Sequence, residues 1–254
     1  MLNFSANLSL LFTERPLPER FAAARAAGFA AVEIQFPYEL DIPTLKTLLQ
    51  ENSLKLVLIN VPAGDLMAGG NGLACVPGKE EEFHSAVARA REYAEALGVP
   101  RINVLAGRKS AESSREDCLA VLRENLHHAS HEFHKAGIET VVEAINLFDM
   151  PGFLVHSVAA MQQLCEHNSR LKMQFDCYHM SRMGEDVLAA LQSNLPLIGH
   201  IQFADNPGRH EPGTGHIDYK PVFSFLRDSD YQGCCGAEYR PSKRTEDTLG
   251  WLKS

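Results

Sequence analysis

The chain of 254 residues lacks several features that would point to particular classes of protein. No apolar run approaches the roughly 20 residues that a membrane-spanning helix needs, so we expect no membrane partner. Basic residues do not outnumber acidic ones, and the net charge of −8 disfavours nucleic acid as the main partner. The N-terminal stretch MLNFSANLSLLF lacks a basic segment, and we expect a first strand there rather than a signal peptide.

Redox motifs, nucleotide motifs and linkers are also missing. The six cysteines show no CxxC spacing, and we interpret them as reduced, buried thiols of a cytoplasmic protein. No glycine-rich loop follows the first apolar run, so no dinucleotide site is predicted. No linker or low-complexity segment divides the chain, and we expect one domain over residues 1–254.

Strand-like apolar runs alternate strictly with helix-like patterns along the chain. Eight strands are predicted, over residues 2–8, 30–34, 54–60, 101–105, 139–144, 171–176, 197–203 and 234–239. Eight helices are predicted between and after them, over residues 18–27, 42–51, 79–97, 115–136, 157–166, 185–192, 220–228 and 246–253. Such alternation implies parallel strands with right-handed crossovers, and at eight repeats it favours a closed α/β barrel, the (β/α)8 or TIM fold.

Four predicted strands of the second half end in side chains that could bind a metal ion: Glu143, Asp176, Gln202 and Glu238. They follow one another at about one strand–helix unit, on the order of 30 residues, so neighbouring strands would bring them to one point. Three carboxylates there would repel one another unless a cation compensates their charge. An all-oxygen set favours a hard divalent ion, Mg²⁺ or Mn²⁺. Taken singly, each could instead be a surface residue or an arginine partner.

Two long loops follow strand ends, where a barrel builds its site. The glycine-rich loop 61–78 is predicted to close over a small substrate, with a plain connection as the alternative. His179 and Arg209 lie just beyond the proposed ligands and are predicted to contact the substrate; a helix-capping histidine and a solvated loop charge are the alternatives. Asn60, which closes the third predicted strand, is predicted to bind substrate as well. His200 is expected to point inward one layer below Gln202.

Several long segments resemble the hydroxypyruvate isomerase family of the xylose isomerase-like barrels. They are FSANLSLLF, VEIQFPYELD, NVPAGDLMAGGNGLACVPGKEEEF, VEAIN, DCYHMSRM, GHIQFADNPGRHEPGTGHIDY and GAEYRP, and they span nearly the whole chain. The resemblance implies a divalent metal held by Glu143, Asp176, Gln202 and Glu238, with Glu143 and Glu238 as the proton-transfer pair. Gln202 stands where many related epimerases have histidine.

The resemblance implies an isomerase that interconverts hydroxypyruvate and tartronate semialdehyde (2-hydroxy-3-oxopropanoate). The sister group of 2-oxo-tetronate isomerases shares almost all these segments, so a four-carbon 2-oxo acid is the main alternative substrate. A ketose 3-epimerase, a metal-dependent endonuclease, a metal-free glycosidase with paired glutamates and a binding barrel are weaker alternatives. We expect a small 2-keto acid as the only partner; whether the protein forms a homo-oligomer is left open.

Overall fold

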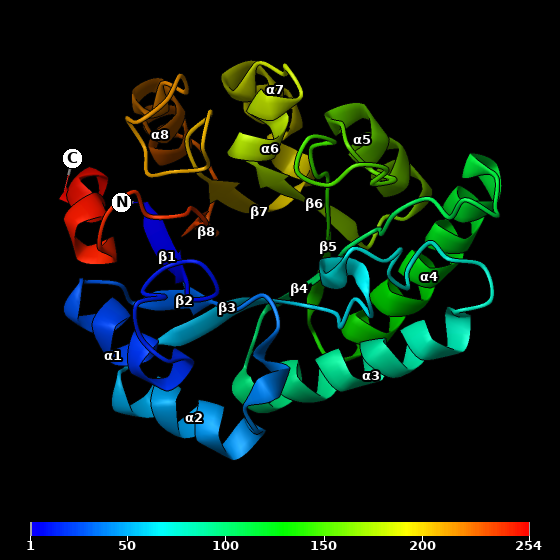
Figure 1. The fold of residues 1–254 in the computed structure, drawn as a ribbon, viewed down its shortest axis with the longest axis horizontal. Coiled ribbons are helices and arrows are strands. Elements are labelled where there is room, and N and C mark those ends of the chain that lie inside the picture. Colours follow the sequence, from blue (N-terminus) through cyan, green and yellow to red (C-terminus); the bar gives the residue numbers. More distant parts are fainter. Residues whose placement is uncertain (1, 254) are drawn as a thin grey trace.

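Eight parallel strands form a closed barrel in the computed structural model, which describes residues 2–253 (Figure 1). The strands are β1 (Asn3–Asn7), β2 (Ala31–Glu33), β3 (Lys55–Asn60), β4 (Arg101–Val104), β5 (Glu139–Glu143), β6 (Leu171–Asp176), β7 (Ile198–Phe203) and β8 (Cys234–Ala237). Each pairs with the next in sequence order, and β8 pairs with β1 to close the ring. The predicted barrel is confirmed.

Helices surround the barrel in sequence order (Figure 1). They are α1 (Leu17–Ala26), α2 (Ile42–Glu51), α3 (Glu80–Leu97), α4 (Arg115–Lys135), α5 (Val158–His167), α6 (Cys177–Arg182), α7 (Val187–Asn194) and α8 (Tyr219–Asp228). Short 3-10 turns are η1 (Pro37–Glu39), η2 (Leu66–Ala68), η3 (Leu195–Leu197) and η4 (Thr245–Lys253). No helix among residues 2–253 is long and apolar enough to cross a membrane.

Local sequence signals account for most helix ends. Ser114 caps α4 in a reciprocal capping box with Asp117, and the Asp218 side chain accepts a hydrogen bond from the Lys220 N–H at the start of α8. Gly98 ends α3 in the left-handed region, at φ 68°. These ends fix where each helix turns back toward the next strand.

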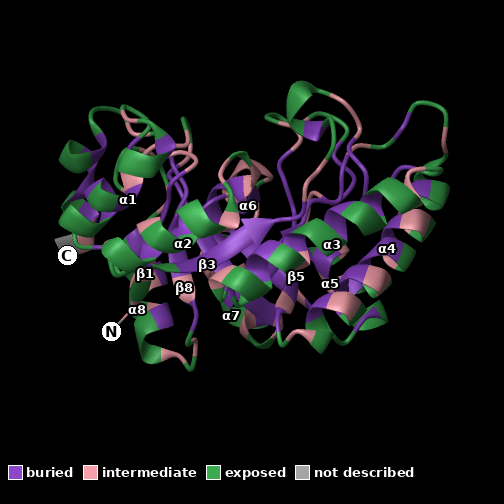
Figure 2. Ribbon diagram, turned by 90° about the horizontal axis from the view of Figure 1, so that it is seen from below, coloured by how far each residue is buried: buried purple, intermediate pink, exposed green. Residues whose placement is uncertain are grey.

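Most residues of the strands are buried, and the barrel ribbon is accordingly largely purple in Figure 2. Phe4, Phe203, Phe223 and Trp251 pack edge to face, with ring centroids 4.9 to 5.4 Å apart for the pairs Phe203–Trp251, Phe203–Phe223, Phe4–Trp251 and Phe4–Phe223. This aromatic cluster joins β1, β7, α8 and the C-terminal segment. All six cysteines are free, and only Cys234 is partly exposed.

Two elements differ from the sequence prediction. Residues 177–182, expected as loop, form the helix α6, because the Asp176 side chain caps it and Gly184 stops it soon after. The last predicted helix is instead the 3-10 segment η4, which is kinked at Leu249. Thr245, Thr248 and Gly250 are weak helix formers, and the two threonine hydroxyls bond other partners.

Candidate active site

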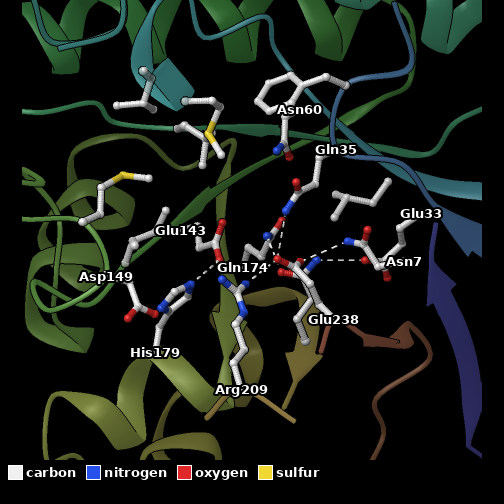
Figure 3. A pocket seen from close by; sticks show the side chains of 18 of the residues that line it. Asn7, Glu33, Gln35, Asn60, Glu143, Asp149, Gln174, His179, Arg209 and Glu238 are labelled. Atoms are coloured by element: carbon white, nitrogen blue, oxygen red, sulfur yellow. Dashed lines mark hydrogen bonds and ion pairs between the residues drawn. The ribbon is translucent and has the colours of Figure 1, made fainter. Parts of the chain in front are cut away.

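A cavity of about 240 Å³ opens at the carboxyl end of the barrel, and most of the predicted site residues line it (Figure 3). Asn60, Glu143, His179, Gln202, Arg209 and Glu238 belong to its wall, and Asp176 lies directly beside them. The rest of the wall is mixed, with polar side chains such as Gln35 and Arg108 beside apolar ones such as Leu58 and Ile145. Both halves of the chain thus supply polar and apolar groups to the cavity.

Asp176 has two separate roles, one for each carboxylate oxygen. Its Oδ1 accepts hydrogen bonds from the N–H groups of Tyr178, at 2.7 Å, and His179, at 3.3 Å, and so caps α6. Its Oδ2 is buried and has no hydrogen-bond partner. The cap therefore fixes the side chain with one oxygen free on the side where His179 and Arg209 lie, 3.6 and 3.7 Å away.

Asn146 determines which ring nitrogen of His179 carries the proton. The Asn146 Oδ1 accepts hydrogen bonds from the N–H groups of Phe148 and Asp149, so its amide nitrogen is the end that faces His179 Nδ1, at 2.7 Å. Nδ1 then accepts, and the proton of the neutral ring lies on Nε2. Burial, helped by the Arg209 charge, holds the pKa of His179 well below its usual range. His179 is therefore a neutral hydrogen-bond donor toward the cavity.

The two glutamates have unequal surroundings. Glu238 accepts hydrogen bonds from Asn7, Gln35 and Arg209, at 3.1, 3.0 and 2.6 Å. Glu143 accepts one, from Asn103 at 3.1 Å, and its other oxygen lies 3.8 Å from His179 Nε2. Figure 3 shows the two carboxyl groups reaching the cavity from different sides, with the Arg209 guanidinium between them.

Burial raises the pKa values of all three carboxyl groups. It raises the pKa of Glu238 to about 8 against the opposing charge of Arg209, and it raises the pKa of Asp176, again against Arg209. Burial, followed by repulsion from Glu238 and Asp176, raises the pKa of Glu143 well above its usual range. Burial therefore disfavours the ionised form of all three carboxyl groups, and the nearby charge of Arg209 opposes this effect only in part.

Arg209 is brought into the cavity by a loop that Asp205 holds together. The buried Asp205 carboxylate accepts hydrogen bonds from the backbone of Asn206, Gly213 and Ile217. Arg209 itself adopts a left-handed backbone, at φ 57°, and its guanidinium lies 5.3 Å above the Tyr178 ring. These contacts hold the Arg209 side chain in the cavity wall, so it is not a solvated loop charge.

A metal ion fits this group of side chains. One oxygen each of Glu143 and Asp176 and one nitrogen of His179 lie within 4.8 Å of one another. Buried carboxylates with raised pKa values, and an Asp176 oxygen without a partner, are what a divalent cation would satisfy. Because the proton of His179 lies on Nε2, the two carboxylates are the better ligands. The four-residue ligand set predicted from the sequence stays a prediction.

A second buried network lies one layer below, and sequence reasoning missed its centre, Glu33. This fully buried carboxylate accepts hydrogen bonds from Ser5, at 2.6 Å, and from Gln202, at 2.8 Å, and its Oε1 lies 2.8 Å from His200 Nε2. His200 thus occupies the deeper layer expected for it. A charged residue within the apolar strand AVE was the signal that could have identified Glu33.

The loop 61–78 covers one side of the cavity and is anchored from below. Arg108 donates hydrogen bonds to the carbonyl oxygens of Leu66 and Gly70, at 3.1 and 2.6 Å. Met67 lines the cavity and still exposes 59% of its surface. Closure of this loop over a substrate stays a prediction.

Comparisons with known proteins identify the family of the chain. The sequence profile of the xylose isomerase-like TIM barrel family matches residues 21–254. Hydroxypyruvate isomerase from Escherichia coli is 45% identical over 99% of this chain and 98% of its own. The 2-oxo-tetronate isomerase of Cupriavidus necator is 42% identical over 100% and 98%. A crystal structure named AP endonuclease, family 2, from Brucella melitensis superposes with a TM-score of 0.96 at 35% identity, covering 100% of this chain and 98% of the other. The chain therefore belongs to the xylose isomerase-like TIM barrel family, and within it to the isomerases related to hydroxypyruvate isomerase and 2-oxo-tetronate isomerase.

Proposed function

We propose that this enzyme interconverts hydroxypyruvate and tartronate semialdehyde. The observation that supports this most is the pair of buried glutamates, Glu143 and Glu238, that reach one small cavity from different strands beside an arginine. A cavity of about 240 Å³ suits a small acid. The names of the two relatives at 45% and 42% identity point to the same class of substrate.

The reaction needs two proton transfers at carbon and one between the substrate's oxygens. A proton leaves C3 of hydroxypyruvate and another is added to C2, while the hydroxyl proton moves from the C3 oxygen to the C2 oxygen. One glutamate takes the first proton as a base and the other delivers the second as an acid, and in the reverse direction they exchange roles. Their different surroundings, three donors on Glu238 and one on Glu143, suit two unlike tasks.

Arg209 and His179 are the residues that would hold the substrate. The guanidinium keeps its charge at any working pH and matches the planar carboxylate of a 2-keto acid. His179, with its proton on Nε2, can donate a hydrogen bond to a substrate oxygen. Asn60 lies in the same wall and offers a further amide.

We propose that Glu143 and Asp176 hold a divalent ion, Mg²⁺ or alternatively Mn²⁺, with Gln202 and Glu238 as the further predicted ligands. Such an ion supplies positive charge beside the substrate's carbonyl and hydroxyl oxygens, which eases removal of a neighbouring proton. Oxygen ligands favour these hard ions over zinc.

An NMR assay in D2O tests this function. Purified enzyme with Mg²⁺ should convert hydroxypyruvate to tartronate semialdehyde, with deuterium from the solvent on C2. Glu143→Gln and Glu238→Gln should each lower kcat by roughly 10² to 10⁴-fold while keeping the melting temperature. Absence of conversion by the wild type would refute the function. Conversion without solvent deuterium would refute the paired glutamates alone.

A four-carbon 2-oxo acid is the second candidate substrate. It is favoured by the 42% identity to 2-oxo-tetronate isomerase and by the extent of the cavity, which continues to Arg108 and Arg240 beyond the carboxylates. The same NMR assay, run on both acids at equal concentration, compares their kcat/KM values directly.

An endonuclease, suggested by the name of the Brucella structure, is not supported by this site. The group of possible metal ligands among the described residues contains one histidine, and the net charge is −8. A multi-metal nuclease needs more ligands and a basic groove for the phosphate backbone.

A further inference from the structure

We infer that Gln174 is a further substrate-binding residue, whose amide oxygen accepts a hydrogen bond from the C3 hydroxyl group of hydroxypyruvate. The inference rests on the proposed function for the identity of the acid. It follows from a chain of directed hydrogen bonds that begins at Glu33 and ends at an unpartnered oxygen of Gln174, whose side chain lines the cavity.

The first link fixes the direction of the Gln202 amide. Both carboxylate oxygens of Glu33 are acceptors, and Oε2 lies 2.8 Å from the Gln202 side chain. The end of Gln202 that faces Glu33 must therefore be its NH2 group. The reverse orientation would place an amide oxygen against a buried carboxylate oxygen.

The second link carries this direction to Gln174. With its nitrogen on Glu33, Gln202 presents its oxygen to Gln174, whose nitrogen donates a hydrogen bond at 2.6 Å. Reversing the Gln174 amide alone would set two oxygens against each other at that distance. The Oε1 of Gln174 is therefore left buried and without a hydrogen-bond partner.

The third observation is that the Gln174 side chain belongs to the cavity wall. Gln174 lies on β6 two residues before Asp176, so both side chains point to the same face, and Gln174 lines the cavity (Figure 3). Among the described residues, only two cavity-lining side chains have a buried polar atom without a partner: Gln174 has an acceptor, Oε1, and Arg209 has a donor, Nε. A buried acceptor is expected to find a donor in the occupied state.

The chemistry of the acid selects the group that meets this acceptor. A carboxylate and a keto oxygen have no hydrogen to donate, whereas a hydroxyl group does. Hydroxypyruvate has one hydroxyl, on C3, the carbon that loses a proton. A hydrogen bond from this hydroxyl to Gln174 would orient that carbon, while Arg209 receives the carboxylate.

Two unreactive acids separate this contact from the rest of binding. Glycerate and lactate of the same C2 configuration differ only in the C3 hydroxyl, and neither can be isomerised. We expect the wild type with Mg²⁺ to bind glycerate about five- to tenfold more tightly than lactate, the worth of one net hydrogen bond. Calorimetric titration, or competition against hydroxypyruvate turnover, gives both Kd values.

Gln174→Met should abolish this preference, because the variant should bind glycerate more weakly and lactate as tightly as the wild type does. If that variant fails to fold, Gln174→Asn, which retracts the amide, should show the same loss in part. A variant that keeps the wild-type preference, or a wild type with no preference, overturns the inference. Hydroxypyruvate turnover without a glycerate preference would leave the proposed function standing, and a preference without turnover would refute the function alone.

Discussion

The substitution Gly236→Ala, which adds a single methyl group, should destabilise the barrel. It lies on β8, in register with Gln202 of β7, and faces the barrel interior beside Glu33. A Cβ added there would lie 2.1 Å from Oε1, 2.6 Å from Oε2 and 2.7 Å from Cδ of Glu33. A flexible surface glutamate could swing away, but this carboxylate is fully buried and bonded on both oxygens.

The expected cost of Gly236→Ala follows from what the methyl group displaces. Ordinary contact requires roughly 3.5 Å, so the carboxylate must move by more than about 1 Å. Its short hydrogen bonds to Ser5 and Gln202 and its contact with His200 cannot all survive such a shift. Depriving a buried charge of its partners costs about 3–5 kcal/mol, a large part of a typical folding free energy of about 5–15 kcal/mol.

Urea denaturation of the variant measures this loss, and Gly250→Ala is the matched control. A Cβ at Gly250 would meet nothing within 4 Å, so that change should stay within about 0.5 kcal/mol. Glu33→Ala removes the clash, and on that background Gly236→Ala should cost less than about 1 kcal/mol. Wild-type stability for Gly236→Ala, or an equal cost with and without Glu33, would refute the role given to this carboxylate.

Three further changes probe the cavity. Asp176→Asn should lower the affinity for Mg²⁺ and the activity together, measured by metal titration and by turnover; a loss of activity at unchanged affinity would contradict a ligand role. Arg209→Lys keeps the charge but loses the planar fork, so KM for hydroxypyruvate should rise about tenfold or more, and an unchanged kcat/KM would show that Arg209 does not bind the substrate. The pKa values of Glu143 and Glu238 are raised, that of Glu238 to about 8. At pH values above the ordinary pKa of glutamate, the folded state therefore binds more protons than the unfolded state. The free energy of unfolding of the metal-free protein, measured with a chelator present, should therefore fall as the pH rises from about 6 to about 9. Added Mg²⁺ should reduce that fall, and a flat pH profile without metal would contradict the raised pKa values.

The barrel itself could be predicted from the sequence because each strand and helix carries its own local signal. Apolar runs, caps such as Asp218 and terminators such as Gly98 are read over a few residues. The convergence of Glu143, Gln202 and Glu238 on one cavity also follows, since the carboxyl ends of parallel strands meet at one end of a barrel.

The directions of the polar side chains could not be predicted in the same way. Gln174, Gln202 and Asn146 are amides whose two ends differ only by the partners they meet. Those partners, such as Glu33 for Gln202, lie far away in sequence and are known only after the barrel has closed. The helix α6 could not be predicted because its six residues are too few to show a helical period, and its cap, Asp176, also fits a metal ligand.

The aromatic cluster of Phe4, Phe203, Phe223 and Trp251 contains an intrinsic fluorophore. Trp251 is the only tryptophan in the chain, and it packs on Phe4 of the first strand and Phe203 of the seventh. Its indole fluorescence therefore reports on the packing between the first strand and the C-terminal segment. The emission spectrum should shift to longer wavelength when β1 and β8 separate, even if the helices remain, so that fluorescence and far-ultraviolet circular dichroism together distinguish opening of the ring from loss of its secondary structure.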